Sequence, residues 1–319
     1  MIRIAIFVCI ALVNVGAAFA QAYPTKPLRM LVGFPPGGPT DITARITAEY
    51  LSRALGQQVI VDNRPGAGGT LAATLLANAT PDGYTIALGA NGEMAISPNL
   101  RSKLPYDPLK DFAPISRVGA AHLALVVHPG VSAKSVRELI GLAKSKPGVI
   151  NFASSGTGST SHLASELLKT MAVIDIVHVP YKGSGPAMSE VMGGQVQMLI
   201  TGYSAVVPHV KAGRLRLLAV TGPRRIKAVP DFPTIGETVT GYDVTSWYGI
   251  FAPSETPKGI LNRLQREIAT MVKKPEVNDK LVALGIEPEG NTAEELAAQM
   301  KEEILKWGKV IKAAGIPKQ

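Results

Sequence analysis

Apolar runs followed by helical spacing of apolar residues recur along the first third of the chain. This order of strand, helix and strand predicts a mainly parallel sheet covered by helices. A turn at Asp82-Gly83 separates the second helix from the third strand. The predicted elements of this part are strands at 28–34, 58–61 and 84–89 and helices at about 39–55 and 70–79.

The same alternation returns after a proline-rich stretch at 105–114. Strands are predicted at 121–128, 149–153, 176–179, 196–201 and 215–220, and helices at 135–145, 160–171, 186–192 and 208–211. A strand at 248–252 then leads back, and helices at 257–273, 275–284 and 292–313 complete the chain. A chain that leaves one α/β unit, builds another and returns predicts two lobes on a hinged cleft. Lobe 1 is predicted at 21–121 and 225–319, and lobe 2 at 122–224.

Two strand-to-helix loops share one plan. The first reads Pro35-Pro36-Gly37-Gly38-Pro39-Thr40-Asp41, and the second reads Ser154-Ser155-Gly156-Thr157-Gly158-Ser159-Thr160. Glycines and hydroxyl residues at such a junction leave backbone N–H groups free at the start of the helix. That end carries roughly half a positive charge and suits an anion. We therefore expect an anion to bind between the two lobes.

The first loop favours a carboxylate over a phosphate. With Gly38 as N-cap, Pro39 falls at the first helical position, where its missing N–H costs nothing. Asp41 then falls at the third position, where its carboxylate caps the helix by reaching back to the N–H of Gly38. We prefer this capping role for Asp41. Its fixed negative charge disfavours phosphate, whereas a single carboxylate fits the N–H groups and the hydroxyl of Thr40.

Several enzyme classes lack their motifs in this chain. Gly156-Thr157-Gly158 resembles part of a dinucleotide fingerprint, but position 161 is Ser instead of the third glycine. No G-K-[ST] triplet marks a phosphate loop, and Ser159 is not in a G-x-S-x-G nucleophile elbow. The histidines show no zinc spacing, so no metal or cofactor is expected. For His162 we prefer a local hydrogen bond that fixes the second loop, with ligand contact as the alternative.

A few other side chains are candidates for the site. Lys182 and Arg64 are possible second anchors for an acid, although long basic side chains are most often solvated. Trp247, Tyr248 and Tyr203 are candidates to line a pocket, although core packing is the commoner role of Trp.

The N-terminus is typical of an export signal. Arg3 precedes the apolar run 4–13 and the small residues that end at Ala20, so residues 1–20 are predicted to be removed. The run is too short for a membrane span, which needs about 20 apolar residues. Cys9 is the one cysteine among the 319 residues, so the mature chain has no disulfide and no cysteine nucleophile.

Charge changes this picture little. Removing Arg3 lowers Lys plus Arg from 33 to 32 against 24 acids, a net charge of +8. The basic residues are scattered, with no run typical of a nucleic-acid arm, so nucleic acid is not an expected partner.

A set of distinctive segments follows one another along nearly the whole mature chain. These segments are Tyr23-Pro24 with Pro27, Phe34–Asp41, Asp62–Gly69, Pro81–Thr85, Pro105–Pro108, Asp111-Phe112, Ser155–Ser159, Val179–Gly183 and Trp247–Gly249. In these segments and their order, the chain resembles the Bug-type substrate-binding receptors of tripartite tricarboxylate transporters.

This resemblance implies a two-lobed periplasmic binding fold of type II, a Venus flytrap in which each α/β lobe has a mainly parallel sheet flanked by helices. It also implies a carboxylate held between the loops, largely by backbone groups and waters. The ligand positions that it transfers to this chain are Phe34, Gly37, Gly38, Thr40, Asp41, Ser155, Gly156, Thr157, Gly158, Ser159, Thr201, Gly202 and Tyr203. Many relatives have aspartate where this chain has Thr201, a departure that bears on ligand preference.

The expected function is that of a monomeric periplasmic receptor, not an enzyme. The resemblance implies a ligand among di- and tricarboxylates, acidic amino acids and aromatic acids, and delivery to membrane permease subunits. Two alternatives stay open. One is a sensing subunit that presents the bound acid to a receptor kinase, and the other is an exported enzyme that acts on a carboxylate.

Overall fold

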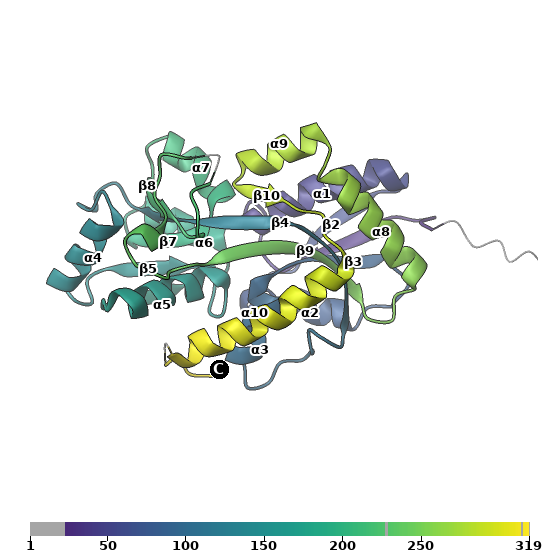
Figure 1. The fold of residues 1–319 in the computed structure, drawn as a ribbon, viewed down its shortest axis with the longest axis horizontal. Helices are drawn as coiled ribbons and strands as arrows, with labels where there is room; N and C mark the ends of the chain where they lie inside the picture. Colours follow the sequence, from purple (N-terminus) through teal and green to yellow (C-terminus); the bar gives the residue numbers. More distant parts are fainter. Residues whose placement is uncertain (1–22, 227–228, 314, 319) are drawn as a thin grey trace, which may run out of the picture.

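Two α/β lobes lie side by side and share long central strands (Figure 1). The computed structural model describes residues 23–226, 229–313 and 315–318. The predicted signal at 1–20, with Cys9, lies outside the described residues. In Figure 1 the first lobe is on the right and the second on the left.

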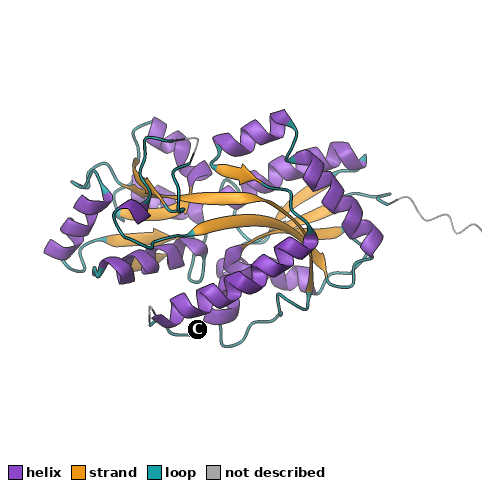
Figure 2. Ribbon diagram, viewed as in Figure 1, coloured by secondary structure: helices purple, strands orange, loops and turns teal. Residues whose placement is uncertain are grey.

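The first lobe is built from both ends of the described chain. It begins with β1 (Leu28–Val32), α1 (Pro39–Leu55), β2 (Val59–Asn63), η1 (Ala67–Gly69), α2 (Thr70–Ala77) and β3 (Thr85–Ala90). It is completed by β9 (Thr245–Pro253), α8 (Lys258–Met271), α9 (Pro275–Ala283) and β10 (Ile286–Pro288). Strand β1 pairs in parallel with β2 and β3, as predicted, and β9 adds an antiparallel neighbour to β3. Helices cover both faces of the sheet (Figure 2).

The second lobe repeats this layout. Its elements are α4 (Val136–Ser145), β5 (Asn151–Ser154), α5 (Thr160–Ala172), β6 (Val177–Pro180), α6 (Ser184–Met192), β7 (Met198–Gly202), α7 (Tyr203–Lys211), β8 (Arg216–Val220) and η3 (Ile235–Glu237). Strand β5 pairs in parallel with β6 and β7. The predicted two-lobed α/β class is thus confirmed, with antiparallel strands where the chain crosses between lobes.

One strand, β4 (Phe112–Val127), runs through both lobes. Its residues 112–122 pair with β9 in the first lobe, and 123–127 pair with β7 and β8 in the second. The sequence predicted a strand only at 121–128. Its first part was not predicted because it contains Pro114 and Gly119, and both residue types are unfavourable inside a strand. The pairing of β4 with β9 shifts register beside each of these two residues, which accommodates them.

Helix α10 (Ala293–Ala313) also connects the lobes (Figure 1). Leu296 and Met300 pack in a core cluster of the first lobe with Trp247. Trp307 and Ile311 pack in the core of the second lobe with Phe152. The C-terminal helix therefore contributes to both cores.

The lobe boundaries at 121/122 and 224/225 stay predictions. Ile226 packs with the core residues of the second lobe, and so do Ile235 and Tyr242. This packing favours a second crossing closer to the start of β9.

The segment after β3 holds two short helices that the sequence analysis did not assign. A π-helical turn, η2 (Gly92–Ile96), leads directly into α3 (Ser97–Leu100). All five residues of η2 are buried, including Glu93. This segment brings an acidic side chain to the cleft between the lobes.

Candidate ligand-binding site

Two adjoining chambers lie in the cleft between the lobes. The inner chamber is a cavity of about 40 Å³, and the outer chamber is one of about 450 Å³. Phe34, Pro35 and Ser155 line both chambers and form the boundary between them. The space is therefore narrow at its inner end and wide at its mouth.

Four helix N-termini converge on the inner chamber. Thr40 lies in the first turn of α1, Thr160 in that of α5 and Ser184 in that of α6, while Gly202 is the N-cap of α7. The lining hydroxyl groups come from Thr40, Ser155, Thr160, Ser161, Ser184, Thr201, Ser246 and Tyr248. Neither Lys nor Arg is among the described residues that line this chamber. Helix ends and hydroxyls thus supply its positive potential, which suits a small anion.

A charged network holds the first loop. The Asp41 carboxylate accepts hydrogen bonds from the N–H of Gly37 at 2.9 Å, from Asn63 Nδ2 at 3.0 Å and from Arg45 Nε at 2.9 Å. Burial would raise the pKa of Asp41, but these hydrogen bonds outweigh it and lower the pKa below its usual value. The predicted capping contact is wrong in its partner, because the carboxylate accepts from the N–H of Gly37 instead of that of the N-cap Gly38.

A neutral network holds the second loop. Ser159 caps α5 and donates to the Gly156 carbonyl at 2.6 Å, and His162 Nδ1 accepts from the N–H of Gly158 at 3.3 Å. His178 Nε2 lies 2.7 Å from Ser154 Oγ, and the two imidazole rings stack with centroids 4.0 Å apart. The predicted local role of His162 is thus confirmed.

Both histidines of this stack are neutral near pH 7. Burial, with the neighbouring His178, lowers the pKa of His162 to about 3. Burial, with Lys169, lowers the pKa of His178 to about 4. The second loop therefore keeps its shape without an ionised side chain in this stack.

The two lobes touch across the cleft. Thr160 Oγ1 donates to Asn91 Oδ1 at 2.8 Å, which joins α5 to the segment after β3. Pro39 packs so closely on Gly202 that an added Cβ there would lie 2.5 Å from the Pro39 Cβ. Pro35 meets Gly183 in the same way, at 2.6 Å. Glycines of the second lobe thus admit the prolines of the first loop.

The thirteen predicted ligand residues fall into three groups in the structure. Those that line the inner chamber are Phe34, Gly38, Thr40, Ser155, Thr201 and Gly202. Gly156 and Thr157 line the outer chamber. Those outside both linings are Gly37, Asp41, Gly158, Ser159 and Tyr203. Ligand contact by any of them stays a prediction.

Other candidates are also separated by the structure. Lys182 lines the outer chamber, whereas Arg64 pairs with Asp62 outside it. Tyr248 lines the inner chamber, and Trp247 is fully buried in the first lobe's core. The sequence analysis missed Glu93, which lies in the inner lining. Its one sequence signal is weak, a lone acid within an apolar stretch that follows a buried strand.

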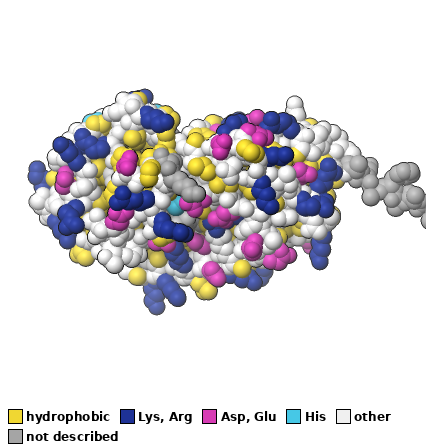
Figure 3. Space-filling model, turned by 45° about the horizontal axis from the view of Figure 1, so that its top comes forward, with side chains coloured by type: hydrophobic (Ala, Val, Ile, Leu, Met, Phe, Trp, Pro, Cys, Tyr) yellow, Lys and Arg dark blue, Asp and Glu magenta, His cyan; other side chains and the backbone are white. Residues whose placement is uncertain are grey.

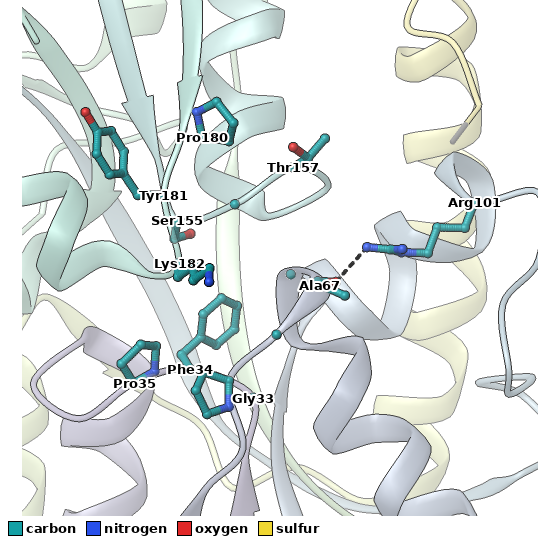
Figure 4. Close-up of a pocket in the computed structure, with 14 residues that line it drawn as sticks. Gly33, Phe34, Pro35, Ala67, Arg101, Ser155, Thr157, Pro180, Tyr181 and Lys182 are labelled. Atoms are coloured by element: carbon teal, nitrogen blue, oxygen red, sulfur yellow. Dashed lines mark hydrogen bonds between the residues drawn. The ribbon is translucent and has the colours of Figure 1, made fainter.

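The outer chamber takes its walls from both lobes. In Figure 4, Gly33, Phe34, Pro35 and Ala67 come from the first lobe, and Ser155, Thr157, Tyr181 and Lys182 from the second. Arg101 donates to the Ala67 carbonyl at 2.8 Å at the rim. The walls are mostly apolar or backbone, with two cations, so they suit the body and far end of an organic acid.

Basic side chains are spread over the visible face of both lobes, with acids among them (Figure 3). In the described parts of the chain, no His, Cys, Asp and Glu cluster is arranged to hold a metal ion. None of the described helices combines the length and the apolar character that a membrane span needs.

The sequence is similar to those of known binding receptors. Residues 43–316 match the tripartite tricarboxylate transporter family receptor. Protein BugT of Bordetella pertussis is 37% identical over 302 residues, which cover 93% of this chain and 91% of BugT.

Two solved structures from Rhodopseudomonas palustris share the fold. Rpa4515 with adipate is 36% identical with a TM-score of 0.91, over 92% of this chain and 99% of that one. MatC with bound malate is 32% identical with a TM-score of 0.85, over 91% of this chain and 100% of that one.

Proposed function

Since the chain belongs to the receptor family of tripartite tricarboxylate transporters, we propose that it captures a small organic acid in this cleft and delivers it to membrane permease subunits. One carboxylate group of the acid occupies the inner chamber. The rest of the acid extends into the outer chamber.

The convergence of four helix N-termini on a chamber without a lining cation carries this proposal. Backbone N–H groups and hydroxyls bind a carboxylate at short range without the long side chains that a salt bridge would order. A cavity of about 40 Å³ leaves room for little more than one such group.

The outer chamber favours an acid with a second polar end. Pro35, Pro65 and Ala67 offer apolar contact to its carbon chain, and Lys182 and Arg101 offer positive charge. The relatives described with adipate and malate hold acids of this type. Dicarboxylates are therefore the first class to test.

The direct test is a thermal-shift screen of the mature protein with adipate, malate, citrate, glutamate and benzoate, followed by calorimetry. A bound acid should raise the melting temperature. At a concentration one hundred times its Kd, the acid adds about 2.7 kcal/mol to the free energy of unfolding. The matched control is adipamide, which keeps the carbon chain and lacks both charges. Absence of any shift over the acid panel, or equal binding of adipamide, contradicts the proposal.

Binding should also close the cleft, because the acid bridges loops of both lobes. Small-angle scattering should show a smaller radius of gyration in the presence of the acid that binds best. An unchanged profile at saturation argues against closure by the ligand.

Two other roles predict different results. If the protein is a sensing subunit for a receptor kinase, deletion of its gene would abolish a transcriptional response to the acid and leave uptake of the acid intact. An enzyme would convert the bound acid, which chromatography after long incubation would detect. We infer a receptor without turnover, because no nucleophile, base and oxyanion set was found in the sequence.

Export and oligomeric state complete the proposal. We propose a monomer in the periplasm, with the signal removed near Ala20. Mass spectrometry of the exported protein should give a chain that begins near Gln21. Retention of residues 1–20, or a lipid on Cys9, would contradict it.

A further inference from the structure

Glu93 is a buried acid in the wall of a chamber that otherwise attracts anions. The residue is 2% exposed, and it lines the inner chamber with Thr40 and Tyr248. Oε1 accepts a hydrogen bond from the N–H of Ala90 at 2.8 Å. Oε2 is buried and has no partner among the described residues. One oxygen is thus anchored, and the other is buried without a hydrogen-bond partner in the wall of the chamber.

The neighbours of Glu93 do not supply a counter-charge. Tyr106 donates its hydroxyl to the Glu93 carbonyl at 2.7 Å, and burial raises the pKa of Tyr106 and of Tyr248, so both are neutral. Oε2 lies against Gly69, where an added Cβ would come within 2.8 Å. From α10, Leu296 and Met300 pack with the adjacent Met94. No Lys or Arg among the described residues pairs with this carboxylate.

An ionised Glu93 and a ligand carboxylate would both be negatively charged, so in so small a chamber they would repel each other. Two carboxyl groups that share a site avoid this repulsion when one of them keeps a proton. The neutral acid then donates from Oε2 to the ligand oxygen. Such a bond also satisfies the buried oxygen that is otherwise without a partner.

We propose that Glu93 binds the ligand carboxylate in its protonated form, so that capture of the acid takes up one proton from solvent. This inference rests on the proposed function, because it places a carboxylate in the inner chamber. It makes Glu93 the residue that restricts the chamber to groups able to accept its hydrogen bond.

The ionisation of Glu93 supports this assignment. Burial raises the pKa of Glu93 to about 7, against the opposing effect of backbone N–H groups at Ala90 and at Glu93 itself. At a pH below that value, Glu93 of the free protein already carries the proton, so binding of the acid takes up little further proton from solvent. Above it the proton must be added on binding, so affinity falls as pH rises, by up to about tenfold per pH unit.

Calorimetry of the mature wild-type protein tests the proton directly. Adipate is the first probe, and the tightest-binding acid of the panel replaces it if adipate does not bind. Titration at pH 8 in phosphate and in Tris, which differ in ionisation enthalpy, should give an uptake approaching one proton per acid. The uptake should shrink toward zero at pH 6. No variant is needed for this measurement, so folding does not limit it.

Glu93→Gln removes the titration and keeps a hydrogen-bond donor of the same shape. Its affinity should stay constant between pH 6 and 8, and its proton uptake should vanish. Glu289→Gln is the matched control, because burial also raises the pKa of Glu289, which lies outside both chambers. This variant should keep the wild-type pH dependence of binding.

Three outcomes would overturn the inference. Acid binding without proton uptake at pH 8 leaves the proposed function standing and removes the role of Glu93. Stronger binding of glutamate at pH 8 than at pH 6, lost in Glu93→Gln, would show that an ionised Glu93 holds an ammonium group. If no acid of the panel binds, the proposed function fails and this inference fails with it.

Discussion

The two loops that close the cleft share one plan and are held by opposite means. The first depends on an ionised carboxylate, with Asp41 braced by Arg45 and the Gly37 N–H. The second depends on neutral hydroxyls and the stacked rings of His162 and His178. Similar loop sequences therefore do not imply similar sensitivity to salt, acid or substitution.

Gly38 of the first loop and Gly158 of the second differ in backbone conformation. Gly38 has an ordinary φ of −82°, and an added Cβ would lie 3.7 Å from the Pro35 carbonyl oxygen. Gly158 has a φ of +82°, and an added Cβ would lie 2.9 Å from a methyl group of Leu100. Position 158 thus requires glycine, whereas position 38 has room for a methyl group.

The largest expected effect follows from this difference. In Gly158→Ala the alanine must adopt the left-handed backbone conformation of Gly158, which costs about 1–2 kcal/mol. Its methyl group also displaces Leu100 or the loop. We expect affinity for the best panel acid to fall by roughly fivefold to thirtyfold, from the conversion of 1.4 kcal/mol per decade. The affinity of Gly38→Ala for the same acid should stay within about threefold of wild type, since this substitution adds no backbone strain of this kind.

Calorimetry on both variants, with circular dichroism as a check of folding, decides this point. Equal losses for the two glycines would mean that the loops have the same steric requirement, contrary to the comparison.

A smaller effect is expected where the first loop inserts into the second lobe. Gly202→Ala places a methyl group against Pro39 where the lobes meet, so it should weaken binding by about tenfold, near the lower end of the 1–3 kcal/mol cost of overpacking. Gly185→Ala is the matched control, because nothing lies within 4 Å of an added Cβ there. Unchanged affinity in Gly202→Ala would show that the acid binds without this contact.

The next effect is on stability in acid and concerns the second loop alone. The pKa of His162 is lowered to about 3 in the folded protein, below the usual 6.5, so the unfolded chain binds the proton more readily. Stability is therefore fully present above pH 6.5 and is lost as the pH falls toward 3, by up to about 1.4 kcal/mol per unit for one proton. Urea unfolding at pH 7.5 and 5.5 should show a loss of about 1 kcal/mol for each of the stacked histidines, since the pKa of His178 is lowered as well.

His162→Gln should reduce that slope while leaving Gly158 a side-chain acceptor. His128→Gln serves as the control, because His128 lies apart from both loops, beside Gly130 and Gly194. An undiminished slope in His162→Gln would assign the acid sensitivity to other groups.

The smallest effect is expected in the first loop. Arg45 is 54% exposed on its side chain, so its ion pair with Asp41 is screened by solvent. Arg45→Gln should cost no more than about 0.5 kcal/mol of unfolding free energy at 0.1 M salt and less at 0.5 M. A loss several times larger, insensitive to salt, would show that the charge of Arg45 is essential to the loop.

Much of the fold was predictable because its periodicity is local. Strands such as β1 and β3 are short apolar runs between turn residues, and α1 repeats its apolar face at helical spacing. The first part of β4 was not predictable, since Pro114 and Gly119 interrupt it and its pairing with β9 depends on residues far along the chain.

The site was predictable where it depends on loop sequence and unpredictable where it depends on packing. The resemblance and the glycine pattern pointed to Gly38 and Thr40, which do line the inner chamber. Glu93 was missed because its burial results from a π-helical turn and from Gly69, neither of which has a pattern in the local sequence.

Helix α10 adds a mechanical consequence to the connection between the lobes. Two bodies joined only by neighbouring strands are free to bend and also to twist about the strands. Helix α10 packs along the strand pair and is anchored by Met300 in the core of one lobe and by Trp307 in the core of the other, so it resists the twist. We expect a joint with a single axis of rotation, so that the two loops return to the same alignment at every closure.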